Sequence, residues 1–141
     1  MVKFFTQEMS DQSEKMMKTD PEVKAKLAGV TLKFILLVTD CPDNEDREMK
    51  LGFDNGELVE NALTVKPAPS DLRTEPLDTS KYAAKVAGPY EVMVQVSTKK
   101  LPMLAALGSM RIEGDMTALI TNMAGLTNLL DIFGTMPELE F

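Results

Sequence analysis

The stretch "LPMLAALGSMRIEGDM", Leu101–Met116, changes structural type several times within a short length of chain. A proline at its second position can open a short helix over residues 102–107, and Gly108 can end that helix. Alternating polarity over 109–114 predicts a strand, and Asp115 is a good N-cap for a further helix. Almost nothing polar faces inward along this stretch. Its apolar residues therefore belong either to the protein's own core or to the wall of a site that holds another molecule.

The residues after Asp115 predict one longer helix with an unusually wide apolar face. Ala118, Ala124, Leu129 and Ile132 extend that face beyond a single stripe. A helix of this kind must be covered on more than one side, by protein or by ligand. The apolar residues at helical spacing are those at positions 116, 119, 120, 123, 126, 130 and 133.

The N-terminal part predicts two helices followed by a strand. Residues 6–18 form a weak amphipathic pattern, and Asp20 with the following proline marks the start of a second helix that Gly29 ends. From residue 30 to 39 the period changes to two. One face of this strand is wholly apolar, and the other becomes apolar midway.

The middle of the chain predicts a hairpin and a crossover. A polar loop leads into a strand over 47–54, and Asn55-Gly56 is a strong signal for a type I′ turn before a strand over 57–63. Residues 66–80 contain three prolines and have no period, so they are a crossover loop. A short strand over 82–87 follows. The segment "YEVMVQVSTKK" is ambiguous, because its alternating valines favour a strand whereas the preceding proline and the final lysines suit a helix.

Length and charge limit the protein's class. The 141 residues fit a single domain over 1–141. A net charge of -7 argues against nucleic acid and against docking on anionic lipid. The longest aliphatic and aromatic run of the strand region, Phe34–Val38, is far too short for a transmembrane span. The N-terminus has no signal-peptide pattern, so we expect a cytoplasmic protein.

The residue types needed for catalysis are scarce. Histidine is absent, which removes Ser/His and Cys/His nucleophiles and the commonest metal ligand. Cys41 lies among carboxylates that would raise its pKa. The acidic loop has neither the ligand spacing nor the glycine of a calcium loop, and a solvated hairpin loop is the favoured interpretation. We therefore expect no enzyme, no cofactor and no metal site. The acidic residues are Asp40, Asp43, Glu45, Asp46 and Glu48.

The chain is rich in methionine, with 11 Met against 6 Phe, 2 Tyr and no Trp. Methionine fills irregular apolar space and adapts to different shapes. An adaptable cavity and a soft core are both consistent with this composition.

Three segments together resemble the sterol carrier protein family of small lipid-transfer domains, over about Asp20 to Leu130. They are "DPEVKAKLAGVTLKF", "MKLGFDNGELV" and, most specifically, "GPYEVMVQVSTKKLPMLAALGSMRIEGDMTALITNM", Gly88–Met123. The resemblance implies an α+β fold with a five-stranded, largely antiparallel sheet: a three-stranded meander, a crossover and two further strands. It also implies helices on one face enclosing an apolar tunnel, and a helix over Pro89–Thr98.

The predicted function is non-enzymatic binding, and transfer, of an apolar lipid such as a fatty acid, a fatty acyl-CoA or a sterol-like molecule. The alternative is a protein-interaction or homodimerisation module of the same fold with a collapsed cavity. Each predicted lipid-binding residue also fits an ordinary core, since core and cavity wall share one pattern. These residues are Phe34, Leu36, Leu51, Phe53, Met93, Leu104, Leu107, Met110, Ile112, Met116, Leu119, Met123 and Leu126.

Overall fold

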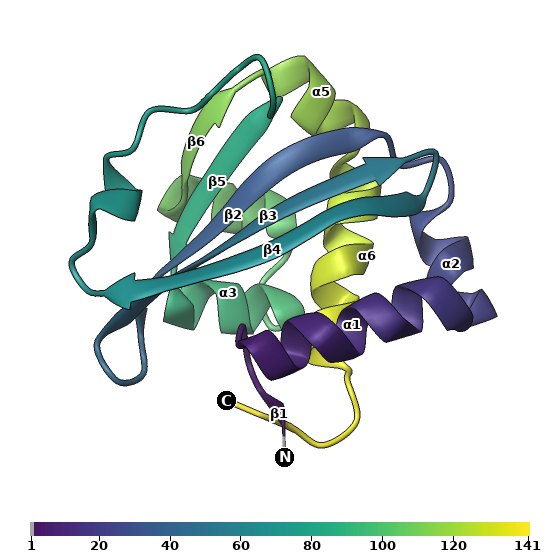
Figure 1. The fold of residues 1–141 in the computed structure, drawn as a ribbon, viewed down its shortest axis with the longest axis horizontal. Helices are drawn as coiled ribbons and strands as arrows, with labels where there is room; N and C mark the ends of the chain where they lie inside the picture. The colour runs from purple at the N-terminus through teal and green to yellow at the C-terminus, as the bar shows by residue number, and fades with distance from the viewer. Residues whose placement is uncertain (1) are drawn as a thin grey trace.

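The computed structural model describes residues 2–141, except for the side chain of Leu104, and shows an α+β fold (Figure 1). A five-stranded sheet has the order β4-β3-β2-β5-β6, and a small parallel pair joins β1 to β7. The strands are β1 (Val2–Lys3), β2 (Leu32–Cys41), β3 (Glu45–Asp54), β4 (Glu57–Pro67), β5 (Ala84–Pro89), β6 (Arg111–Gly114) and β7 (Leu139–Glu140). The helices are α1 (Gln7–Thr19), α2 (Pro21–Leu27), η1 (Asp71–Arg73), α3 (Tyr90–Ser97), α4 (Met103–Ala106), η2 (Leu107–Ser109), α5 (Met116–Thr121) and α6 (Met123–Gly134).

The predicted meander, crossover and two further strands are confirmed. β2, β3 and β4 pair antiparallel, β5 adds to β2 in parallel after the crossover, and β6 pairs antiparallel with β5. The β3–β4 turn has the two left-handed residues of a type I′ hairpin, with φ of 49° at Asn55 and 87° at Gly56. The sheet is therefore mixed but mostly antiparallel.

Both faces of the central strand β2 are covered. Its inner face, which includes Phe34 and Leu36, packs in the layer shared with the helices. Its outer face carries Ile35 and Leu37, also buried. Part of that outer face is covered by the crossover, in which Leu72 is buried. The backbone carbonyl of Leu72 accepts a 2.7 Å hydrogen bond from the Lys85 ammonium. The predicted second apolar patch on this strand is thus explained by the crossover.

The segment with alternating valines is a helix, as the family resemblance implied, and the strand favoured by its periodicity is wrong. α3 begins immediately after Pro89, whose φ of -69° suits a helix start. Met93, Val96 and Ser97 are buried, at the i, i+3 and i+4 spacing of one helix face. Tertiary packing of that face outweighs the strand preference of valine.

The single long helix predicted after Asp115 is also wrong, because two helices, α5 and α6, meet at Asn122. The Asn122 side chain satisfies backbone groups at the break. Its Oδ1 accepts from the amide of Thr31 at 3.3 Å, and its Nδ2 donates to the carbonyl of Ala118 at 2.9 Å. α6 is largely buried, whereas α5 leaves Met116 and Ile120 44% and 62% exposed.

The two ends of the chain meet beneath the helices, an arrangement that the sequence pattern did not predict (Figure 1). The β1–β7 pair brings Phe4 and Phe5 into the core, where the Phe5 ring packs edge-on against Phe133 at 6.2 Å. Arg47 of β3 donates to the carbonyl of Phe4 at 3.0 Å. Aromatic side chains of the chain itself therefore close this end of the apolar layer. Within the described residues, no helix is both long and apolar enough to cross a membrane.

Candidate functional site

Most of the residues predicted to bind lipid lie in one continuous apolar layer between the sheet and the helices. The rings of Phe34 and Phe53 stack there at 6.4 Å. Fully buried members are Phe34, Leu36, Leu51, Phe53, Met93, Leu119 and Leu126. Partly buried members packed against this layer are Met110, Ile112 and Met123.

Three predicted residues stand apart from this group. Leu107 is half-buried in η2, and Met116 is largely exposed at the start of α5. Met116 is the first residue of α5, directly after the Asp115 N-cap, and its side chain is 44% exposed. The side chain of Leu104 lies outside what the structure describes.

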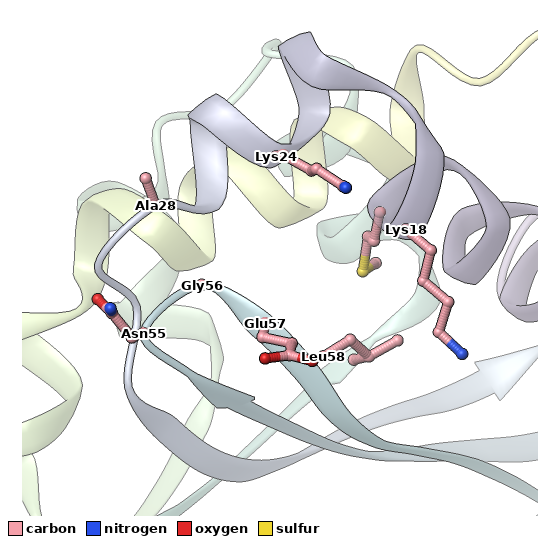
Figure 2. A pocket seen from close by; sticks show the side chains of 8 residues that line it. Lys18, Lys24, Ala28, Asn55, Gly56, Glu57 and Leu58 are labelled. Atoms are coloured by element: carbon pink, nitrogen blue, oxygen red, sulfur yellow. The ribbon is translucent and has the colours of Figure 1, made fainter.

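A pocket of about 430 Å³ opens between the α1–α2 corner and the β3–β4 hairpin (Figure 2). Met17 supplies apolar surface from α1, and Leu58 supplies it from the start of strand β4. Lys18 and Lys24 stand on the helical side, and Glu57 on the hairpin side. The complete lining is Met17, Lys18, Lys24, Ala28, Asn55, Gly56, Glu57 and Leu58. None of the thirteen predicted lipid-binding residues is among them.

Local sequence signals position the helical wall of this pocket. The Asp20 side chain accepts from the amide of Glu22 at 2.9 Å, so α2 starts directly after α1. Gly29, at φ 82°, then turns the chain from α2 toward β2. The sequence predicted both ends of α2 but not the space beside it.

The hairpin wall is held against this corner by close backbone contacts. The Gly56 amide donates to the carbonyl of Val30 at 2.8 Å, and the Asn55 amide donates to the hydroxyl of Thr31 at 2.9 Å. A Cβ at Gly56 would lie 2.8 Å from the carbonyl oxygen of Leu27. Glycine is therefore required here both for the turn and for the close approach of the hairpin to α2.

The pocket joins charged and apolar surface. Met17 is only 6% exposed and belongs to the same core as the predicted lipid-binding residues, and Leu58 packs against that core. Lys18 and Lys24 are exposed at the rim, where Lys18 lies 3.7 Å from Glu14. An apolar floor under a charged rim suits an elongated molecule with one apolar end.

The acidic segment is solvated only in part: Asp40 and Asp43 are exposed, as a solvated loop predicts, whereas Asp46 lies in β3 and is completely buried. Arg73 of the crossover donates to both Asp46 oxygens, at 2.8 and 2.9 Å, and Ser70 donates twice. Burial alone would raise the Asp46 pKa, but these hydrogen bonds outweigh it and hold the pKa well below its usual range. This carboxylate anchors the crossover.

The cysteine does not have the properties of a nucleophile. Burial raises the pKa of the Cys41 thiol to about 11, and its sulfur lies 3.4 Å from the carbonyl of Val38. Among residues 2–141, histidine, cysteine and carboxylate side chains form no group of three that could hold a metal ion.

The chain was compared with protein families, curated sequences and solved structures, and only solved structures share its architecture. No protein-family profile and no curated protein sequence matches the chain. A crystal structure of sterol carrier protein 2 superposes with a TM-score of 0.67 at 12% identity, covering 93% of this chain and 97% of that one. The chain has the sterol carrier protein fold. The solution structure of a conserved hypothetical protein of Thermus thermophilus, described as a candidate sterol carrier protein, superposes with a TM-score of 0.63 at 15% identity.

That second superposition covers 92% of this chain and 87% of the Thermus thermophilus protein. The sterol carrier fold thus accounts for most of the chain. Fold elements that the family resemblance implied, including helix α3 in place of a strand, agree with this result.

Proposed function

We propose that this protein binds an apolar lipid without catalysing a reaction, and that it transfers the lipid between membranes or partner proteins. A fatty acid, a fatty acyl-CoA or a sterol-like molecule is the proposed ligand, and the cytoplasm is the proposed location. The sterol carrier fold supports lipid binding in general. The thiol of Cys41 is buried and its pKa is raised, which is consistent with a non-enzymatic role.

The observation that carries this proposal is the pocket of about 430 Å³ with Met17 and Leu58 in its lining. Its volume lies within the usual range for small-molecule sites, about 300–1,000 Å³. We propose that the lipid tail enters here and continues along the apolar layer past Phe53 and Leu51. A tail of about a dozen methylenes offers on the order of 10 kcal/mol of gross transfer free energy, enough for useful affinity after ordering costs.

Methionines make such a path feasible in a core that is filled by its own side chains. Buried Met9, Met17, Met49 and Met93 contribute to the layer from helices and sheet. Each has three rotatable bonds, so it can repack around an entering chain at lower cost than a branched or aromatic side chain. The tunnel implied by the resemblance would then form on loading, by displacement of flexible side chains.

The test is displacement of a fluorescent fatty acid from delipidated protein, with native mass spectrometry of the purified protein for co-purified lipid. Leu58→Trp should fill the pocket and weaken binding by about tenfold or more, since a bulky ring replaces the space for several methylenes. Val59→Trp is the matched control, because the neighbouring side chain is 53% exposed and does not line the pocket.

Circular dichroism should show that both variants are folded. Absence of saturable binding and of co-purified lipid in the unmodified protein would refute the proposal. Equal affinity of folded Leu58→Trp and Val59→Trp would refute the assignment of this pocket.

A further inference from the structure

The surface of α5 and the start of α6 is uncharged. From Met116 to Leu130 the chain contains no Asp, Glu, Lys or Arg, although charged residues make up 26% of the whole. Large apolar side chains are exposed here, with Ile120 at 62% and Met116 at 44%. The exposed residues of this surface, called the α5 face below, are Met116, Thr117, Ile120, Thr121, Ala124 and Thr127.

Polar side chains on and beside the α5 face direct their hydrogen-bond donors into the chain's own backbone. Thr121 donates to the carbonyl of Thr117 at 2.8 Å, and Thr127 donates to the carbonyl of Met123 at 2.9 Å. At the break between the helices, the Asn122 amide is used in the same way. The hydroxyl donors of Thr121 and Thr127 therefore need neither water nor a partner, which lowers the cost of moving this surface into a medium of low polarity.

We propose that the α5 face docks on a zwitterionic lipid bilayer, with Ile120 and Met116 inserted at the level of the headgroups. This inference rests on the proposed lipid-carrier function. Apolar side chains at i and i+4 on a short surface helix, without charge, suit the bilayer interface. The net charge of -7 disfavours anionic membranes, and an uncharged face allows contact with a surface that carries no net charge.

The same charge argues for a bilayer rather than a second copy of the chain. Two copies that meet through this face bring together two molecules of charge -7 without any opposite charge in the contact. A zwitterionic surface imposes no such repulsion.

The α5 face is linked to the helical wall of the pocket through α6, which packs against α2. Asn128 of α6 donates to the carbonyl of Lys26 in α2 at 2.9 Å, and Lys26 lies 3.5 Å from Asp131 of α6. If the α5 face docks on a membrane, α2, which forms one wall of the pocket, is held to the docked part of the protein through its contacts with α6.

The absence of tryptophan in the chain permits a direct test. Ile120→Trp and Val59→Trp each introduce a single tryptophan at an exposed position. With phosphatidylcholine vesicles, the emission of Ile120→Trp should shift to the blue, and that of Val59→Trp should not change. In co-sedimentation, Ile120→Glu should lower the partition coefficient of the protein by about tenfold or more, while Val59→Glu should leave it unchanged.

Two results would overturn the docking proposal. The first is equal partition of Ile120→Glu and the unmodified protein on phosphatidylcholine vesicles. The second is a blue shift of Ile120→Trp without vesicles that grows with protein concentration, since that shows a second copy on the face.

The proposed function is tested separately by fatty acid displacement in the absence of vesicles, where Ile120→Glu should bind as the unmodified protein does. Loss of vesicle binding with intact fatty acid binding refutes only the docking surface. Vesicle binding without fatty acid binding refutes only the carrier function.

Discussion

Substitution of Gly125 by alanine tests how tightly α6 is seated against the start of the sheet. A Cβ at Gly125 would overlap Cγ2 of Val30 and lie 3.5 and 3.6 Å from the Val30 Cβ and Cγ1. We take the cost of this overpacking as about 2 kcal/mol. Alanine gains about 1 kcal/mol over glycine within a helix. Gly125→Ala should therefore lower the free energy of unfolding by about 1 kcal/mol.

A second substitution identifies the cause. Val30→Ala removes two buried methyl groups and should cost about 1.6 kcal/mol, at about 0.8 kcal/mol each. In the double variant the colliding methyl is gone and the helix gain remains, so the net cost should be about 0.6 kcal/mol. Simple addition of the two single effects gives about 2.6 kcal/mol. The difference, about 2 kcal/mol, is the steric overlap itself.

The assay is urea unfolding of all four proteins, followed by far-ultraviolet circular dichroism. The comparison requires similar slopes of the free energy against urea concentration, which show that the unfolded states are alike. Single effects that add to within about 0.5 kcal/mol would refute the close contact between α6 and Val30.

Other predictions concern the rest of the scaffold. Gly134→Ala should cost about 2 kcal/mol or more in urea unfolding, because its Cβ would overlap the backbone carbonyl of Ser97, which cannot be trimmed. Gly108→Ala should not destabilise the protein, because a Cβ there meets open space. An equal loss of stability in Gly108→Ala and Gly134→Ala would contradict the close contact between Gly134 and Ser97. Asp46→Asn should lower the free energy of unfolding at neutral pH by about 1–3 kcal/mol. The difference in this free energy between the variant and the unmodified protein should narrow below about pH 4. The difference narrows because the Asp46 carboxylate has a lowered pKa in the folded protein, and its contribution to stability is lost when it is protonated. A difference that stays constant with pH would exclude this role of Asp46. Cys41 should resist alkylation at neutral pH until urea unfolds the protein, given its burial and a pKa of about 11, whereas rapid labelling of the native state would show an accessible thiolate.

Local signals in the sequence predicted the parts of the fold that local chemistry determines. Asp20 caps α2 through its own side chain, and Asn55-Gly56 adopts the positive φ values of the predicted turn. These features depend on a few consecutive residues. The valines of α3 were misread because alternation is a weak guide where a buried helix face decides the structure.

The sequence pattern fails to predict the structure where segments distant in the sequence meet. The break at Asn122 depends on a hydrogen bond to Thr31, which lies far away in the sequence. Burial of Phe4 and Phe5 depends on pairing between the two ends of the chain. No periodicity within either segment carries these contacts, so hydrophobic pattern alone misses them.

The position of the pocket has the same origin. Apolar pattern identifies side chains that point inward, and seven of the thirteen predicted lipid-binding residues are fully buried. A void, however, depends on how far apart neighbouring elements are held. Here the tip of the hairpin is held close to α2 at Gly56, while Leu58 and Met17 line the pocket that opens beside this contact. The close contact at Gly56 thus fixes where the hairpin and α2 meet. The pocket that we propose as the mouth for a lipid lies directly beside that contact.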